Sequence, residues 1–526
     1  MDIAREAARR RTFAIISHPD AGKSTLTEAL ALHTQMIGEA GVTHGKAGRR
    51  ATVSDWMEME RARGISISST ALQMEFGDHV INVVDTPGHA DFSEDTYRVL
   101  AAVDVAVMVL DAAKGLEPQT LKLFDVCRRS GIPVVTVVNK WDRPGLDPLE
   151  LLDQVQQRLG IVPTPVTWPI GIAGDFRGAL DRRTGRTLLY ERTAGGATMA
   201  GERVLTDEEA RELIGQDWQT AVEGSELLDA DGLVHDQDQF LQGRTTPVLF
   251  AASLLNFGVA QLLDVLVDIA PPAGDRPDAA GVRRPVDAPF SAYVFKVQAG
   301  MDRAHRDHVA FARVCSGIFE RGEVVEHAAT GRPFATKYAQ SMFGRARTSA
   351  DVAWPGDIIG LVNASGLRIG DTLRAPGERV EFPAVAKFAP EHFAVIRSVD
   401  TGRYKQFRRG IEQLDREGVA QVLRSDARGD QAPVLAAVGP MQFEVVQDRL
   451  RQEFRAETRL EPLPYSLARE VAVADVPTLA GRSGVETFER SDGVALALFG
   501  DRWVLRSVER AHPELVLGVL AADVEL

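Results

Sequence analysis

SHPDAGKS, residues 17 to 24, is the stretch that decides the fold of this 526-residue chain. It follows the apolar run FAIIS (13–17) and precedes TLTEALALH (25–33), so it joins a predicted strand to a predicted helix, as a phosphate-binding loop does. Ala21 and Gly22 are small enough for backbone N–H groups to approach phosphate oxygens, and the helix N-terminus adds a favourable dipole. Lys23 would supply charge to the outer phosphates and Ser24 a hydroxyl to magnesium, although Ser17 replaces the usual first glycine. On this stretch alone, an ordinary strand-to-helix turn remains an alternative.

Three further apolar runs on the C-terminal side of this loop predict buried parallel strands. They are HVINVVD (79–85), VDVAVMVLD (103–111) and IPVVTVVN (132–139), with β-branched residues at consecutive positions. Helical periodicity lies between them, as in EPQTLKLFDVCRRSG (117–131). The region from about Thr12 to Pro272 is therefore predicted to be an α/β domain with a parallel sheet wrapped by helices.

The motif DTPGH (85–89) begins at the end of one predicted strand, at the sheet edge where ligands of open α/β sheets bind. Asp85 could hold magnesium through water, and Gly88 could bring its N–H to a terminal phosphate with little steric hindrance. Taken alone, the motif could also be a surface turn built by Asp85, Pro87 and Gly88.

NKWD (139–142), at another strand end, predicts recognition of a guanine base. Asp142 can accept hydrogen bonds from N1–H and the 2-amino group of guanine, whereas adenine has no amino group at that position. Asn139 can bond to N7 and to backbone groups, and the stem of Lys140 can lie over the base. A polar turn is the alternative for NKWD alone. In sequence after the two other motifs it predicts GTP binding and disfavours an ATP-dependent kinase.

The rest of the chain predicts a multidomain protein. The Gly- and charge-rich segment near 175–242 is interpreted as an insertion in a GTP-binding domain that spans 1–272, and 273–289 as a linker. Short strands with glycine turns over 290–381 predict a small β-barrel. A β-α-β-β-α order within 382–526 predicts an α+β ferredoxin-like domain.

Composition sets limits on partners and location. The formal charge is −14, so we expect any RNA contact to be confined to local patches rather than a broad basic face. The sequence has no apolar stretch of membrane-spanning length, and its charged start leads us to expect no signal peptide. We therefore expect a cytoplasmic protein, a monomer without membrane or DNA contact. GRYKQFRRG (402–410) could touch RNA, but the favoured interpretation is the solvated face of an amphipathic helix.

The three motifs in this order resemble the translational GTPase family. The resemblance implies GTP/GDP and Mg²⁺ as cofactors and His89 as the residue that positions the attacking water when the ribosome engages. It also implies that SDWMEMERARGISIS (54–68) is a nucleotide-sensing switch, with Ser66 at a position where threonine usually binds magnesium. AASLLN (251–256) matches the last guanine-binding element less well, and Ser253 and Leu254 are its candidate contacts. The predicted nucleotide-binding residues are Ser17, His18, Pro19, Asp20, Ala21, Gly22, Lys23, Ser24, Thr25, Asp85, Thr86, Pro87, Gly88, His89, Asn139, Lys140, Trp141, Asp142, Ser253 and Leu254, and the predicted metal ligands are Ser24, Ser66 and Asp85.

Within that family, the chain resembles the bacterial release factor 3 family in four segments. They are residues 54–68, residues 290–317, APEHFAVIR (389–397) and GPMQFEVVQDRL (439–450). This implies a ribosome-stimulated GTPase of translation termination that promotes dissociation of class I release factors after peptide release. The alternatives are an elongation-factor-G-like or ribosome-protection GTPase, which the chain length after Pro272 disfavours, and a GTP-gated binding module whose turnover is incidental.

Overall fold

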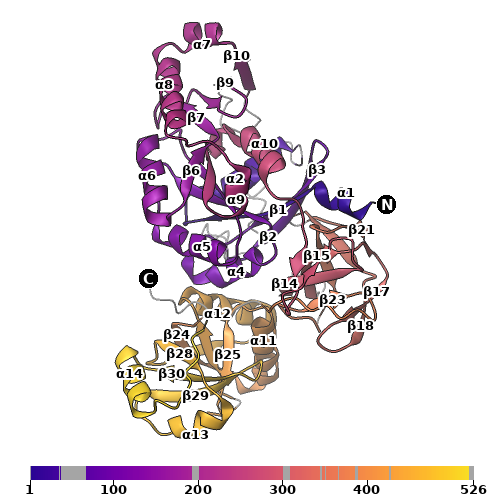
Figure 1. The fold of residues 1–526 in the computed structure, drawn as a ribbon. Helices are drawn as coiled ribbons and strands as arrows, with labels where there is room; N and C mark the ends of the chain where they lie inside the picture. The colour runs from indigo at the N-terminus through magenta and orange to yellow at the C-terminus, as the bar shows by residue number, and fades with distance from the viewer. Residues whose placement is uncertain are drawn as a thin grey trace.

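The computed structural model describes residues 2–34, 36, 67–191, 201–299, 308–343, 346–349, 351–364, 366–384, 389–425, 428–429 and 431–520. Its N-terminal part is the predicted α/β domain (Figure 1). The sheet has the strand order β2-β3-β1-β4-β5-β11-β6, and all neighbours are parallel except the antiparallel pair β2 and β3. Its elements are α1 (Ile3–Ala8), β1 (Arg10–Ser17), α2 (Lys23–His33), β2 (Thr70–Phe76), β3 (His79–Asp85), η1 (Ala90–Phe92), α4 (Ser93–Leu100), β4 (Val105–Asp111), α5 (Pro118–Arg129), β5 (Val134–Asn139), α6 (Pro148–Leu159), β6 (Val162–Pro165), β11 (Thr245–Phe250), η3 (Ser253–Leu255) and α10 (Val259–Ile269).

Both faces of this sheet are buried, which is why its strands consist of consecutive apolar residues. In β1, Ala14 and Ile16 belong to one hydrophobic cluster, whereas Phe13 and Ile15 belong to the cluster on the other face. Helices on both faces therefore cover the central strands and leave their carboxyl ends as the free edge of the domain.

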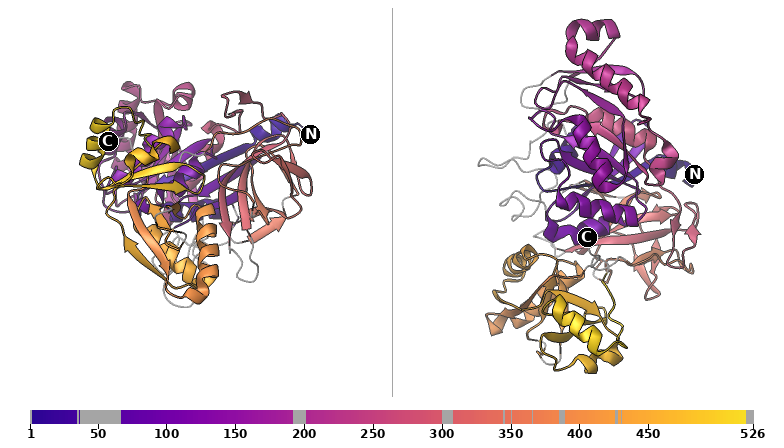
Figure 2. Two further views of the ribbon diagram at one scale, coloured as in Figure 1. Left: turned by 90° about the horizontal axis from the view of Figure 1, so that it is seen from below. Right: turned by 60° about the vertical axis from the view of Figure 1, so that its left-hand side comes forward.

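A second, four-stranded antiparallel sheet interrupts the chain between β6 and β11, and it lies at the far end of the molecule from the C-terminal part (Figures 1 and 2). It begins at Thr167, ahead of the start near 175 that the composition indicated. The Gly- and charge-rich composition starts only after β7, because β7 is a buried and mainly apolar strand that resembles the strands of the α/β domain in composition. The inserted elements are β7 (Thr167–Ile170), β8 (Gly178–Asp181), β9 (Arg186–Glu191), β10 (Gly201–Leu205), α7 (Asp207–Leu213), α8 (Gln216–Ala230) and α9 (Gln237–Leu241).

The segment interpreted as a linker contains a short hairpin of β12 (Arg276–Pro277) and β13 (Arg283–Arg284). Arg276 holds it against the α/β domain by donating to the carbonyl oxygens of Ala101 at 2.8 Å and Val103 at 3.2 Å. On its other side, Arg284 donates to Ser316 Oγ at 2.9 Å and to Glu378 Oε2 at 3.0 Å. The lack of periodicity in this stretch therefore does not mean that it is unattached.

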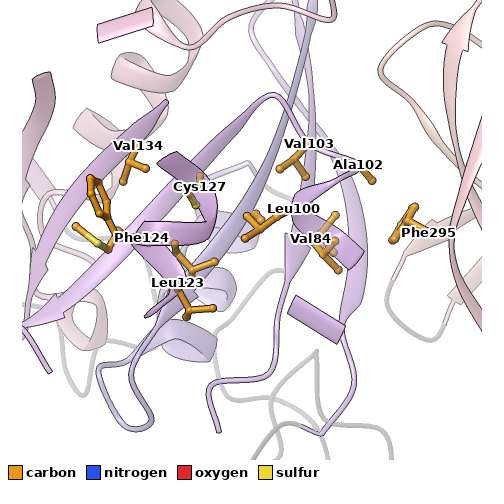
Figure 3. Close-up of a cluster of buried hydrophobic side chains, with 14 of the residues drawn as sticks. Val84, Leu100, Ala102, Val103, Leu123, Phe124, Cys127, Val134 and Phe295 are labelled. Carbon is orange, nitrogen blue, oxygen red and sulfur yellow. The ribbon is translucent and has the colours of Figure 1, made fainter. Parts of the chain in front are cut away.

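The middle part of the chain is the predicted β-barrel. Its strands are β14 (Ser291–Ala299), β15 (His308–Ser316), β16 (Phe319–Glu320), β17 (Val324–His327), β18 (Arg332–Ala335), β19 (Ala339–Phe343), β20 (Ala346–Ser349), β21 (Val352–Ala353), β22 (Ile358–Val362) and β23 (Thr372–Arg374). Phe295 of β14 joins the same hydrophobic cluster as Val84 and Leu100 of the α/β domain (Figure 3). The two parts therefore share a core.

A buried ion pair reinforces this contact. Arg10 Nε lies 2.9 Å from Asp357 Oδ2, and the two side chains are only 6% and 5% exposed. Asp357 also accepts hydrogen bonds from the backbone N–H of Trp354 at 2.9 Å and from Gln73 Nε2 at 3.0 Å. Burial raises the pKa of the Asp357 carboxyl, although the nearby Arg10 opposes that shift. The carboxylate at this interface therefore has its hydrogen-bond donors, but removing its charge from water costs free energy.

We expect Asp357→Ala to destabilise the protein by about 2–3 kcal/mol, because it removes a buried ion-pair partner of Arg10 and leaves the buried N–H of Trp354 without its acceptor. Glu6→Ala is the matched control, since Glu6 pairs with the same Arg10 at 2.8 Å but its side chain is 24% exposed. Its cost should stay below about 1 kcal/mol. Urea unfolding followed by tryptophan fluorescence measures both, and equal shifts of the midpoint would contradict the assignment.

The C-terminal part is the predicted α+β domain. The order β27-β24-β26-β25 with two helices on one face is ferredoxin-like, and β25 extends it by pairing with β29. Phe407 is 1% exposed within the helix cluster, whereas its neighbours Arg408 and Arg409 are exposed, so the stretch that begins α11 has a buried face and a basic solvated face. The elements are β24 (His392–Ser398), α11 (Tyr404–Arg416), β25 (Gln421–Arg424), β26 (Val434–Ala437), α12 (Met441–Phe454), β27 (Thr458–Pro462), β28 (Leu467–Glu470), α13 (Val476–Leu479), β29 (Val485–Arg490), β30 (Ala495–Phe499) and α14 (Arg502–Ala511).

No helix in the described part of the chain is both long and apolar enough to cross a membrane.

Candidate nucleotide site

The predicted motifs meet at one edge of the sheet because their strands are parallel and in register. Ile15 of β1 pairs with Asp85 at the end of β3, and Asp111 at the end of β4 pairs with Asn139 at the end of β5. The loops that follow these strand ends therefore leave the sheet side by side, which is the usual ligand position in an open α/β sheet.

The loop that follows β1 has two residues in the left-handed region, Asp20 at φ 65° and Gly22 at φ 97°. Gly22 is required there for a second reason. A Cβ on it would lie 2.3 Å from Nδ2 of Asn139, so only glycine lets the loop and the base motif approach each other. Helix α2 begins at Lys23 directly afterwards, and its first N–H groups face the loop.

Lys23 and Asp85 are paired at the base of the loop. The Lys23 ammonium donates to Asp85 Oδ1, and both side chains are almost fully buried. The other oxygen, Oδ2, is buried and accepts no hydrogen bond from any residue that the structure describes. A buried carboxylate oxygen without a donor, beside the start of α2 and Ser24, fits a divalent cation or a water bound to one.

The DTPGH turn is fixed against the phosphate loop. Thr86 Oγ1 donates to the carbonyl of Ile15 at 2.7 Å, and a Cβ on Gly88 would lie 3.4 Å from Pro19 Cα. His89 follows with its side chain 34% exposed and its Nδ1 3.2 Å from Oδ1 of Asp91. The turn thus presents a histidine next to the loop on the solvent side.

Asn139 connects the base motif to the phosphate loop and to the loop after β11. Its Nδ2 donates to the carbonyl of Ala21 at 3.0 Å, and its Oδ1 accepts from the backbone N–H and the hydroxyl of Ser253, at 3.0 and 2.8 Å. The amide therefore uses its hydrogen-bonding groups to position neighbouring loops. The structure thus assigns Ser253 a partner within the protein, whereas Leu254 is 44% exposed.

Lys140 has φ 64° and donates to the Asp20 carbonyl and, at 2.8 Å, to Asp111 Oδ2. Burial tends to raise the pKa of Asp111, but the hydrogen bond and charge of Lys140, together with the Ala113 N–H and the charge of Lys114, lower that pKa below its ordinary value. Sequence inspection missed Asp111, although its position at the end of the run 103–111 was a usable signal.

Trp141 and Asp142, the last two residues of NKWD, have different surroundings. The Trp141 indole is fully buried and packs edge-on against Phe250 at 4.8 Å between ring centroids, so its side chain belongs to the core and not to a ligand-facing surface. This corrects its inclusion among the nucleotide contacts. Asp142 is half-buried, and no hydrogen bond or ion pair joins its carboxylate to another residue within the described ranges. Ser66 lies outside the described residues.

Comparison with known proteins bears on the identity of this site. A family model described as "Elongation factor Tu GTP binding domain" matches residues 8–272, one described as "Elongation factor G domain 2" matches 289–375, and one described as "Class II release factor RF3, C-terminal domain" matches 382–509. The chain is 46% identical to the peptide chain release factor 3 of Synechococcus elongatus over 525 residues, which cover 99% of the chain and 94% of that relative. It is also 46% identical over 519 residues to that of Gloeobacter violaceus, with 98% of each covered.

A crystal structure of a protein from Thermus thermophilus has the same fold, with a TM-score of 0.69, 22% identity, and coverage of 93% of this chain and 72% of that one.

Proposed function

The chain belongs to the peptide chain release factor 3 family, and from this premise we propose which of its residues carry GTP binding and hydrolysis on the ribosome. The protein is a translational GTPase that uses GTP/GDP and Mg²⁺ and acts in translation termination. The observation that carries the residue assignment is the amide of Asn139, which ties the phosphate loop to Ser253 in the loop after β11.

In the proposed site the phosphate tail lies on the loop 17–24, with Lys23 and Thr25 at the start of α2 and Gly88 close to the terminal phosphate. Asp85 and Ser24, together with Ser66, hold Mg²⁺, which when bound neutralises charge on the outer phosphates. The orphaned Oδ2 of Asp85 supports this placement. Asp142 accepts from the guanine base, and Lys140 covers it with its aliphatic stem.

Hydrolysis by this arrangement needs no covalent intermediate. We assign to His89 the positioning of the attacking water in line with the terminal phosphate, while Lys23 and backbone N–H groups of the loop stabilise the charge that develops. The partly exposed side chain of His89, directly after Gly88, supports this role. The ribosome would act by moving this turn.

The proposed cellular role is to promote the departure of class I release factors from the ribosome after peptide release. The domain boundaries that we propose for this work are 1–272 for GTP binding, 273–289 for the docked connection, 290–381 for the barrel and 382–526 for the α+β domain. We further propose a cytoplasmic monomer that contacts neither DNA nor membranes.

GTP hydrolysis with and without ribosomes, followed by recycling of a class I release factor on terminated complexes, tests this function. We expect ribosomes to stimulate hydrolysis and GTP to accelerate release-factor departure. Stimulation without recycling would retain the GTPase and reject the role in release-factor departure.

A further inference from the structure

The residue that contacts His89 is held by another domain. Oδ1 of Asp91 lies 3.2 Å from His89 Nδ1, and Oδ2 of the same carboxylate accepts a hydrogen bond at 2.8 Å from the backbone N–H of Met441. Met441 is the first residue of α12, in the C-terminal domain, which adjoins the α4 side of the GTP-binding domain in Figure 1. One carboxylate therefore bridges the proposed catalytic histidine and the N-terminus of a helix 350 positions away in the chain.

The contact at Asp91 is tight on the α12 side. A Cβ on Gly439 would lie 2.1 Å from Cγ of Asp91 and 2.4 Å from each carboxylate oxygen, although Gly439 itself does not have a positive φ. Glycine is present there because the carboxylate occupies the space, and not because the backbone conformation demands it. The N-terminus of α12 adds the favourable field of its first N–H groups to the single hydrogen bond.

The surrounding interface includes the same turn. Phe92, next to Asp91, is 6% exposed and packs against Val445 of α12 and Ile67, and the His89 ring lies 6.1 Å from the Phe92 ring. Further along α4, Arg98 donates to the carbonyl of Gly418 at 3.1 Å. A cavity at this interface is lined by residues of all three parts of the chain, so the packing between them is incomplete. The C-terminal domain thus rests directly on the segment that carries His89.

The two contacts at His89 Nδ1 require different forms of the ring. The backbone N–H of Asp91 points to Nδ1 at 3.3 Å and needs a lone pair there, whereas the Asp91 carboxylate needs a proton on the same nitrogen. A displacement of the carboxylate relative to the ring therefore changes which of the two contacts Nδ1 can make, and the Met441 N–H holds the carboxylate in its present place.

We propose that Asp91 is a positioning residue that latches His89 while α12 is docked, so that movement of the C-terminal domain controls GTP hydrolysis. The inference rests on the proposed role of His89. In the docked state Asp91 and Phe92 keep the imidazole within its own turn. When α12 moves away, Asp91 loses the Met441 N–H and the ring is released to orient water.

Gly439→Ala tests the latch from the C-terminal side, because its methyl group displaces the Asp91 carboxylate without removing any group from the GTP-binding domain. We expect single-turnover GTP hydrolysis without ribosomes to rise about tenfold, a typical coupling between sites. The ribosome-saturated rate and the GTP dissociation constant should be unchanged, so the stimulation ratio falls by the same factor. Asp91→Ala should give the same rise without ribosomes, and the double variant should not add to it.

Gly366→Ala is the matched control, since within the described part of the chain a Cβ there meets nothing within 4 Å and Gly366 has no positive φ. It should behave as the parent protein. The rise in Gly439→Ala must disappear in a His89→Ala background, and ¹⁵N spectra should show a changed tautomer at His89. A structural defect alone would produce neither result.

An unchanged ribosome-free rate in both Gly439→Ala and Asp91→Ala, with His89→Ala still losing ribosome stimulation, would overturn the latch and leave the proposed function intact. A rise that persists without His89 would also overturn it. Full stimulation in His89→Ala alone would instead reject the catalytic role of His89 and the latch together.

Discussion

His89→Ala is expected to lower ribosome-stimulated GTP hydrolysis by about 10²- to 10⁴-fold, the range for loss of a group that orients or deprotonates a reacting water. GTP affinity should change little, because Lys23, the phosphate loop and Asp142 provide the proposed binding contacts. The variant separates a GTPase switch from a GTP-gated binding module, in which turnover is incidental and release-factor recycling would survive. Single-turnover hydrolysis with saturating ribosomes gives the rate, and fluorescent GTP titration gives the affinity.

His79→Ala is the control for this measurement. His79 begins β3, the strand that ends at Asp85, so it lies at the opposite edge of the same sheet. Its replacement should leave the stimulated rate within about twofold of the parent protein, as expected for a site that touches no reacting group. A stimulated rate in His89→Ala that equals that of His79→Ala would remove His89 from the mechanism.

The part of the site that could be predicted from the sequence is the part that local rules specify. Asp85 and Asn139 are the last residues of strands rich in β-branched residues. Parallel strands bring their carboxyl ends to one edge of the sheet, where these two side chains meet the ligand loops. The sequence alone predicts that Gly22 lets the loop approach phosphate oxygens. The structure adds that it also leaves room for the amide of Asn139, a contact between residues far apart in the chain.

The contacts that sequence inspection missed are those that depend on packing between distant segments. Trp141 stands between two predicted ligand residues, yet its ring faces the core, because the chain turns after β5 at Lys140, whose φ is 64°, and the indole packs against Phe250. Asp91 is one acidic residue in a turn, and nothing local indicates that Met441 will donate to it. The same holds for the Arg10 and Asp357 pair. Local patterns thus predicted the α/β, β-barrel and α+β parts of the fold, but not the contacts between them.

Asp142→Asn is expected to lower GTP affinity by about 10³-fold or more, because a buried or half-buried polar mismatch at a base-recognition site costs several kcal/mol. The carboxylate offers two acceptors to the N1–H and 2-amino donors of guanine. An amide offers one acceptor and one donor, and its NH₂ would face the 2-amino group. Xanthine has a carbonyl oxygen at that position, so the variant should bind xanthosine triphosphate in preference to GTP.

Competition of GTP, ATP and xanthosine triphosphate for a fluorescent nucleotide measures this exchange in the parent protein and the variant. Asp147→Asn is a suitable control, because Asp147 lies nearby and its carboxylate caps α6 by accepting from the Leu149 N–H at 2.9 Å, which an amide oxygen can also do. It should not alter the base preference. Loss of GTP binding without a gain for xanthosine triphosphate would mean that Asp142 supports the loop and does not read the base. Tight ATP binding by the parent protein would remove the guanine assignment, since adenine presents only N1 at that position, and N1 is an acceptor that would face the carboxylate.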